Sequence, residues 1–100
     1  MSNRCLVLTD ARWILPDRVV EHHDLWVEDG TIVDLVPTPR RRPRGTQVHS
    51  FGNALVSPGL VDLHVHGGGG ADFMDGTPTA IAVACRTHLR HGTTTLFPTT

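Results

Sequence analysis

PGLVDLHVH, residues 58–66, is the stretch that decides the fold class of this 100-residue chain. After its Pro-Gly turn, apolar and polar residues alternate, as expected of a strand whose two faces differ chemically. Further on, Thr77 and Pro78 suit the N-cap and first position of a helix, and Gly92 suits its C-terminal end. Residues 93–97, TTTLF, are β-branched and aromatic and predict a second strand. Strand, helix and strand with short connections predict a βαβ unit with two parallel strands.

The predicted helix has one face suited to packing against the first strand. Arg86 and Arg90 point away from that face, so the opposite side of the helix is expected to meet water. The positions that share the inner face are Ile81, Ala84, Cys85, His88 and Leu89. The strand residues expected to pack against the helix are Val61, Leu63 and Val65.

The first half of the chain has a different pattern, in which short β-like runs alternate with turn signals. Asp29-Gly30 lies between two such runs and predicts a two-residue hairpin, because both positions tolerate positive φ. Residues 37–45, PTPRRRPRG, contain three prolines and a glycine and are expected to form a loop. The runs expected to form strands are residues 6–8, 13–15, 19–20, 25–27, 31–33 and 53–56.

Composition excludes several classes of protein. Nine Lys and Arg residues, ten Asp and Glu residues and a net charge of −1 argue against nucleic-acid binding. The longest apolar run is far shorter than the roughly 20 residues that a membrane span needs. The run after Arg4, which Asp10 soon ends, is too short for the core of a signal peptide. Cys5 and Cys85 lie far apart and predict neither a disulfide framework nor a Cys-rich zinc site. A cytoplasmic protein with no membrane or nucleic-acid partner is therefore expected.

A βαβ unit alone leaves its sheet edges and one sheet face open. Parallel sheets occur almost only where both faces are covered. We therefore expect these 100 residues to be the opening part of a longer α/β protein.

His64 and His66 are the residues most suited to chemistry. Positions i and i+2 of a strand point to the same face, about 6.6–6.8 Å apart along it, so two imidazoles can share one metal ion. Asp62 lies on that same face as a supporting polar group. Two histidines spaced in this way also occur by chance in ordinary protein interiors, where they only form hydrogen bonds.

Three stretches of the sequence resemble a known family. PGLVDLHVH resembles the first barrel strand of the amidohydrolase superfamily, and the hairpin LWVEDGTIVDLV resembles the N-terminal β-sandwich of that superfamily. HGGGGADFMDGTP, HLRHG and TTTLFPTT are similar to segments of the metal-dependent N-acetylglucosamine-6-phosphate deacetylases. The resemblance covers nearly the whole chain. Some of these deacetylases have amide side chains in place of the two histidines, whereas this sequence keeps both.

The resemblance implies a fold. Residues 1–57 would be the N-terminal β-sandwich segment, and residues 58–100 would be strand 1, helix 1 and strand 2 of a (β/α)8 barrel of the TIM type. The rest of the barrel would follow Thr100, so the chain would be an N-terminal fragment of a longer protein.

The resemblance also implies a function in amino-sugar catabolism. The full-length enzyme would hydrolyse the acetamide of N-acetylglucosamine 6-phosphate to glucosamine 6-phosphate and acetate, as a homo-oligomer. His64 and His66 would be ligands of a divalent metal, with zinc favoured and iron, cobalt or nickel as alternatives. The other ligands, the general base and the substrate phosphate contacts would come from later strands, so no catalytic residue is expected within this fragment and the fragment alone should be inactive.

Other polar residues are expected to have structural roles. Gly67–Gly70 suit a turn beside the site, with backbone contact to substrate as the alternative. Asp72 and Asp75 are interpreted as solvated or capping residues. The residues interpreted as structural are His88 and His91 at the helix end, expected at the opposite end of the strand from the metal; His22, His23 and His49 in the β-rich half; and Trp13 and Trp26 in the core.

The arginine cluster of residues 40–44 contains Arg40, Arg41, Arg42 and Arg44. The run has no interleaved aromatic residue, so a solvated loop is expected, with a subunit or phosphate contact as the alternative.

The sequence is also compatible with two other functions. Dihydroorotases and hydantoinases, which act on cyclic amides, also begin with a PGxxDxHxH pattern. A non-catalytic β-rich interaction module, in which the histidines are only packed, is the alternative from another functional class.

Overall fold

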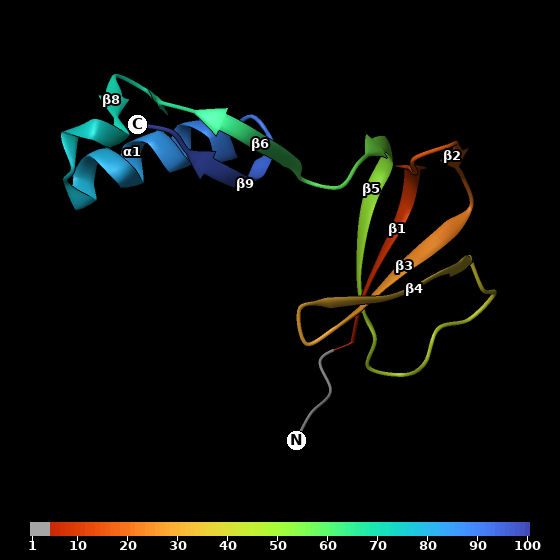
Figure 1. Ribbon diagram of the computed structural model, residues 1–100. Coiled ribbons are helices and arrows are strands. Elements are labelled where there is room, and N and C mark those ends of the chain that lie inside the picture. The colour runs from red at the N-terminus through yellow and green to blue at the C-terminus, as the bar shows by residue number, and fades with distance from the viewer. Residues whose placement is uncertain (1–4) are drawn as a thin grey trace. The chain divides into compact units, whose positions relative to one another are not determined.

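The computed structural model describes residues 5–100 (Figure 1). Residues 1–4 lie outside the described part. The prediction that the chain has no signal peptide depends partly on these residues. The chain divides into two compact units, one up to Ser57 and one from Pro58 to Thr100. Among residues 5–100, no helix is long and apolar enough to cross a membrane.

The first unit is a single mixed β-sheet. Its central strand β1 pairs antiparallel with β2 and β3 and parallel with β5, and β3 pairs antiparallel with β4. All five strands therefore belong to one sheet, where the resemblance implied a sandwich. The strands are β1 (Cys5–Ile14), β2 (Val19–Val20), β3 (His23–Glu28), β4 (Thr31–Pro37) and β5 (Gln47–Val56).

The predicted hairpin joins β3 to β4. Asp29 and Gly30 have φ values of 48° and 78°, as a primed two-residue turn requires. The loop expected from the proline-rich run lies between β4 and β5. The predicted runs at 6–8 and 13–15 form one continuous strand rather than two, and the last strand begins at Gln47, six residues before the predicted start at Asn53.

Irregular residues in three neighbouring segments bend the sheet at one level. Asp10 in β1, His22 between β2 and β3, and Asn53 in β5 have φ values of 53°, 56° and 63°. The pairing of β1 with β5 also shifts register between Thr9 and Ala11. Since bulges bend strands and increase their twist, these aligned irregularities account for the curl of the sheet.

The core of the first unit is small. Val7, Ala11 and Trp13 of β1 are its buried apolar residues. The Trp13 indole N–H donates to the carbonyl of His23 at 2.9 Å, and its ring meets Phe51 edge-on with centroids 6.1 Å apart. Trp13 is therefore a core residue, as predicted.

A buried carboxylate ties the arginine-rich loop to the sheet. Asp24 is 0% exposed. It accepts hydrogen bonds from Arg42 Nε at 2.7 Å, Arg42 Nη2 at 3.0 Å, Thr9 Oγ1 at 2.6 Å and Thr38 Oγ1 at 3.0 Å. The prediction that the whole arginine cluster is a solvated loop is wrong for Arg42, because a buried charge needs a charged and hydrogen-bonded partner. The other members of the cluster, Arg40, Arg41 and Arg44, are exposed.

This ion pair predicts a loss of stability in acid. Burial alone would raise the pKa of Asp24, but hydrogen bonds from Arg42, Thr9 and Thr38 outweigh it and hold the pKa below its usual value. A group whose pKa is lowered in the folded state stabilises the fold above its unfolded pKa, about 3.9, and loses that effect as pH falls through the folded pKa. The free energy of unfolding should therefore fall as the pH drops below about 4.

Urea unfolding measured from pH 6 to pH 2.5 checks this prediction. Asp24→Asn should be less stable than the unchanged protein at pH 6, and the two unfolding free energies should approach each other in acid. A constant gap over the whole pH range would show that Asp24 is not the group responsible.

The second unit contains the predicted strand, helix and strand. β6 and β9 pair in parallel, and α1 connects them along the chain. Thr77 caps the helix by accepting from the Ala80 N–H at 3.1 Å, with Pro78 at the first helical position. The elements are β6 (Leu60–Val65), β7 (Gly67–Gly68), β8 (Ala71–Asp72), η1 (Phe73–Asp75), α1 (Pro78–Leu89) and β9 (Thr93–Pro98).

Fewer residues pack between β6 and α1 than the sequence predicted. The buried residues are Val65, Phe73 and Ala84, with Cys85 and Leu96 packed against them. Leu63 is 74% exposed, and Val61, Ile81 and Leu89 are also exposed, so the prediction that they pack between strand and helix is wrong. Two strands and one helix cannot surround these positions, and the pairing of β6 with β9 is irregular between Asp62 and Val65.

Candidate metal centre

The two histidines of residues 58–66 lie side by side at the end of β6. The ring centroids of His64 and His66 are 5.0 Å apart, and the ring planes make an angle of 77°. Both residues are exposed. The arrangement leaves two neighbouring imidazoles accessible from solvent, which two ligands of one ion require.

Asp62 supports the main chain of this pair. Its half-buried carboxylate accepts a hydrogen bond from the backbone N–H of His64 at 3.1 Å. The contact lies where the pairing of β6 with β9 is interrupted, so the carboxylate binds an N–H group within that interruption. The predicted supporting role of Asp62 therefore takes the form of a contact with the backbone of His64.

The glycines after His66 allow the chain to pack closely. A Cβ atom on Gly67 would lie 2.1 Å from the carbonyl oxygen of Ala71, and one on Gly68 would lie 2.8 Å from His88 Nε2. Gly67 and Gly68 pair with Asp72 and Ala71 in the short β7–β8 ladder. Close backbone packing thus accounts for these glycines.

Asp72 and Asp75 cap the short helix η1. The Asp72 carboxylate accepts from the Met74 N–H at 2.8 Å, and the Asp75 carboxylate accepts from the Asp72 N–H at 3.0 Å. This reciprocal pair is a capping box.

His88 makes a main-chain contact that the sequence did not predict. Its Nε2 lies 2.7 Å from the carbonyl oxygen of Gly67, which directly follows His66. The His88 side chain therefore contacts the segment just beyond the histidine pair, although the chain directly after the helix lies at the start of β6, where the Leu60 N–H donates to the Gly92 carbonyl at 2.8 Å. The one signal in the sequence is the glycine at position 68, where any side chain would collide with the His88 ring.

Three of the remaining histidines, His23, His49 and His91, contact main-chain or aromatic groups. His91 lies just after α1, and its Nδ1 is 2.8 Å from the Thr87 carbonyl of that helix. In the first unit, His23 Nδ1 lies 2.8 Å from the Glu21 carbonyl, and His49 meets Phe51 edge-on at 4.9 Å.

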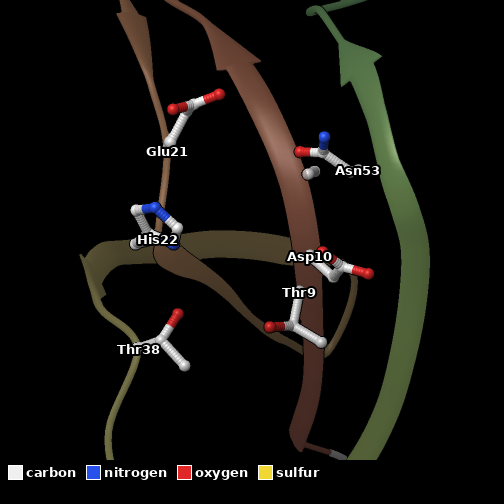
Figure 2. Close-up of a pocket in the computed structure, with 7 residues that line it drawn as sticks. Thr9, Asp10, Glu21, His22, Thr38 and Asn53 are labelled. Atoms are coloured by element: carbon white, nitrogen blue, oxygen red, sulfur yellow. The ribbon is translucent and has the colours of Figure 1, made fainter.

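A cavity of about 190 Å³ lies in the first unit, where the sheet bends (Figure 2). The residues with left-handed backbone at the bend, Asp10, His22 and Asn53, all line it. The other lining residues are Thr9, Ala11, Glu21 and Thr38. Figure 2 shows the Glu21 and Asp10 carboxylates on opposite sides of this space. The cavity follows from the curl of the sheet.

His64 and His66 could supply part of the ligand set of a metal site. Two imidazoles suit zinc, iron, cobalt or nickel. Across residues 5–100, however, no group of three or more His, Cys, Asp or Glu side chains is placed to hold an ion. His64 and His66 can therefore supply two ligands, and neither Asp62 nor His88 joins them as a third.

No family model matches the chain. Individual relatives do. The chain is 32% identical over 104 residues to the human N-acetylglucosamine-6-phosphate deacetylase, an alignment that covers 96% of this chain and 24% of the relative. It is 31% identical over 94 residues to an N-acetylgalactosamine-6-phosphate deacetylase from Escherichia coli O157:H7, covering 94% of this chain and 22% of the relative.

A solved structure has the same fold. The N-acetyl-D-glucosamine-6-phosphate deacetylase from Mycobacterium smegmatis, solved in complex with N-acetyl-D-glucosamine-6-phosphate, matches 94% of this chain and 24% of its own. The TM-score is 0.77 and the sequence identity is 30%. Over nearly its whole length, the chain is thus similar to N-acetylglucosamine-6-phosphate deacetylases, which are metal-dependent amidohydrolases.

Two facts define the scope of this similarity. The chain spans about a quarter of the length of the deacetylases it matches. It is also 30% identical to a relative with a different activity, adenine deaminase 2 from Bradyrhizobium sp., over 92% of this chain and 15% of the relative. The similarity therefore concerns nearly the whole of this chain but only a part of each deacetylase. It does not by itself establish the activity of the whole protein.

Proposed function

We propose that the protein is a metal-dependent deacetylase that hydrolyses the acetamide of N-acetylglucosamine 6-phosphate to glucosamine 6-phosphate and acetate. The observation that carries this proposal is the pair of accessible imidazoles, with ring centroids 5.0 Å apart, in a chain that is similar to the deacetylases. The relative solved with N-acetyl-D-glucosamine-6-phosphate supports the substrate.

The proposal includes the architecture. Residues 1–57 would be the N-terminal part of a β-sandwich, and residues 58–100 would be the first βαβ unit of a (β/α)8 barrel. The parallel pairing of β6 with β9 and the exposed Leu63 support this, since further strands and helices would cover such residues. The rest of the sandwich and barrel would come from chain beyond these 100 residues.

In the proposed mechanism, His64 and His66 hold a divalent metal at the carboxyl end of the first barrel strand, where active sites of such barrels lie. The chemistry supplied by that ion is polarisation of the amide carbonyl and a lowering of the pKa of water toward about 7. Asp62 holds the backbone of His64, and the capped η1 and the glycine segment hold the chain after His66. The general base, further ligands and phosphate contacts would come from later strands.

The proposed setting is the cytoplasm. Cys5 and Cys85 are both free thiols, which suits a reducing compartment. Zinc is the proposed metal, with iron, cobalt or nickel as alternatives, and a homo-oligomer is the proposed state of the full-length enzyme.

Acetate release from the two N-acetylated sugars and ring opening of the two cyclic amides, both measured with the full-length protein, test the proposed reaction. The substrates to compare are N-acetylglucosamine 6-phosphate, N-acetylgalactosamine 6-phosphate, dihydroorotate and hydantoin. We expect the highest kcat/KM for the first, and we expect dialysis against a chelator to abolish turnover until a divalent metal is restored. Ring opening of a cyclic amide in preference to deacetylation would assign the protein to the dihydroorotase or hydantoinase kind. Inactivity toward all four, with no metal bound, would favour an interaction module.

A further inference from the structure

The main chain around His66 is held by three different elements. The Val65 carbonyl accepts from the Thr99 N–H at 2.8 Å, just after β9. The His66 carbonyl accepts from the Phe73 N–H at 2.9 Å, at the start of η1. The Gly67 carbonyl is bound by His88 Nε2 at 2.7 Å, from α1. Three consecutive carbonyls are thus fixed from three directions, and only the third contact comes from a side chain.

The contact from His88 is specific in its chemistry. A carbonyl oxygen only accepts hydrogen bonds, so His88 Nε2 carries the hydrogen and donates it. The ring is half-buried, and Gly68 lies so close to it that a Cβ atom there would be 2.8 Å from Nε2. The ring therefore has little freedom to move away from Gly67.

The helix that carries His88 is itself firmly placed. Ala84, one turn before His88, is completely buried against Val65 and Phe73. The helix start is fixed by the Thr77 cap. The hydrogen bond from His88 therefore links a firmly placed helix to the peptide that follows His66.

We propose that His88 is a positioning residue for the metal ligand His66. The inference rests on the proposed function. By donating to the Gly67 carbonyl, His88 fixes the peptide after His66 and so restricts where the His66 imidazole points. Residues that orient metal ligands in this indirect way typically change metal affinity or activity by about 10–100-fold when they are replaced.

Two substitutions of similar size separate donation from packing. His88→Gln keeps an N–H donor at the same number of bonds from the backbone as Nε2, whereas His88→Met fills similar space without a donor. Both glutamine and methionine are good helix formers, so helix propensity is matched. His91→Met is the control, because His91 lies just after α1 and its ring nitrogen contacts the Thr87 carbonyl of that helix.

The main measurement is the metal dissociation constant of the full-length protein, obtained by competition with a chelator of known affinity. We expect His88→Met to weaken metal binding by about tenfold or more, His88→Gln to recover most of the affinity, and His91→Met to match the unchanged protein. Thermal unfolding of the metal-free variants reports any loss of fold, and kcat and KM for N-acetylglucosamine 6-phosphate are measured beside it. We expect kcat to fall more than KM rises.

The outcomes are distinguishable. Unchanged metal affinity in His88→Met, with only a lower unfolding temperature, would overturn the positioning role and leave a packing role. Equal losses in His88→Gln and His88→Met would also overturn it, because donation would then not be the cause. His64→Ala is measured in parallel: if it retains full metal affinity, the proposed metal site itself fails, whereas loss of metal in His64→Ala alone removes only the role of His88.

Discussion

Replacing His66 by alanine in the full-length protein is expected to lower kcat/KM for N-acetylglucosamine 6-phosphate by roughly 100-fold or more and to reduce bound metal. The reason is the geometry of the pair: the His64 and His66 rings are neighbours with centroids 5.0 Å apart, so loss of either leaves one imidazole where two were available. His64→Ala should have the same effect. Metal content by mass spectrometry and steady-state kinetics check both variants.

The control for this prediction is His91→Ala, which removes an exposed histidine of the same unit whose ring contacts the Thr87 carbonyl. It should retain metal and turnover. The variants His64→Ala and His66→Ala should also unfold at nearly the temperature of the unchanged metal-free protein, since both side chains are exposed. Full activity and full metal content in either variant would remove that histidine from the metal centre.

Replacing Arg42 by methionine is expected to destabilise the first unit by about 3–5 kcal/mol. The substitution leaves the Asp24 carboxylate, which is 0% exposed, without its charged partner. Thr9 and Thr38 would still donate to it, but two neutral donors cannot replace a guanidinium that makes two contacts with one carboxylate. Urea unfolding near neutral pH, followed by tryptophan fluorescence, measures the loss.

Arg41→Met is the matched control, because Arg41 directly precedes Arg42 in the same loop and its side chain is exposed. The change there should stay within about 0.5 kcal/mol. The double variant Asp24→Leu/Arg42→Met removes both charges together and should recover part of the stability, since a buried pair often costs little to replace with apolar residues. Equal stability of Arg42→Met and Arg41→Met would refute the importance of the ion pair.

Local signals in the sequence predicted the parts of the fold that short-range chemistry controls. Asp29-Gly30 specifies its turn because both residues have positive φ. Thr77 and Pro78 specify the helix start through a side-chain cap and a fixed φ. The strand, helix and strand of the second unit follow from such signals, which need no knowledge of distant residues.

Contacts between distant residues were not predictable in the same way. Four arginines in one loop look alike in sequence, and only the folded sheet brings Arg42, 18 residues away, to Asp24. The contact of His88 with Gly67 spans 21 residues and depends on how the glycine segment folds back beside the helix. The exposure of Leu63 could not be predicted either, because alternation specifies two faces of a strand but not how much of each is covered.

At the candidate metal centre, the spacing of His64 and His66 predicted neighbouring rings, and the structure has them. The sequence could not reveal that the Asp62 carboxylate binds the His64 N–H, because that contact depends on an interruption in the pairing of β6 with β9. It also could not supply the other ligands, since no third ligand joins the pair within residues 5–100.

The most direct measurement of the central claim is a crystal structure of the full-length protein with anomalous diffraction collected at the absorption edge of the bound metal. The account predicts an anomalous peak about 2.0–2.1 Å from one ring nitrogen each of His64 and His66, as for zinc bound by histidine. A metal peak coordinated by other residues, with both of these imidazoles free of it, would contradict the account.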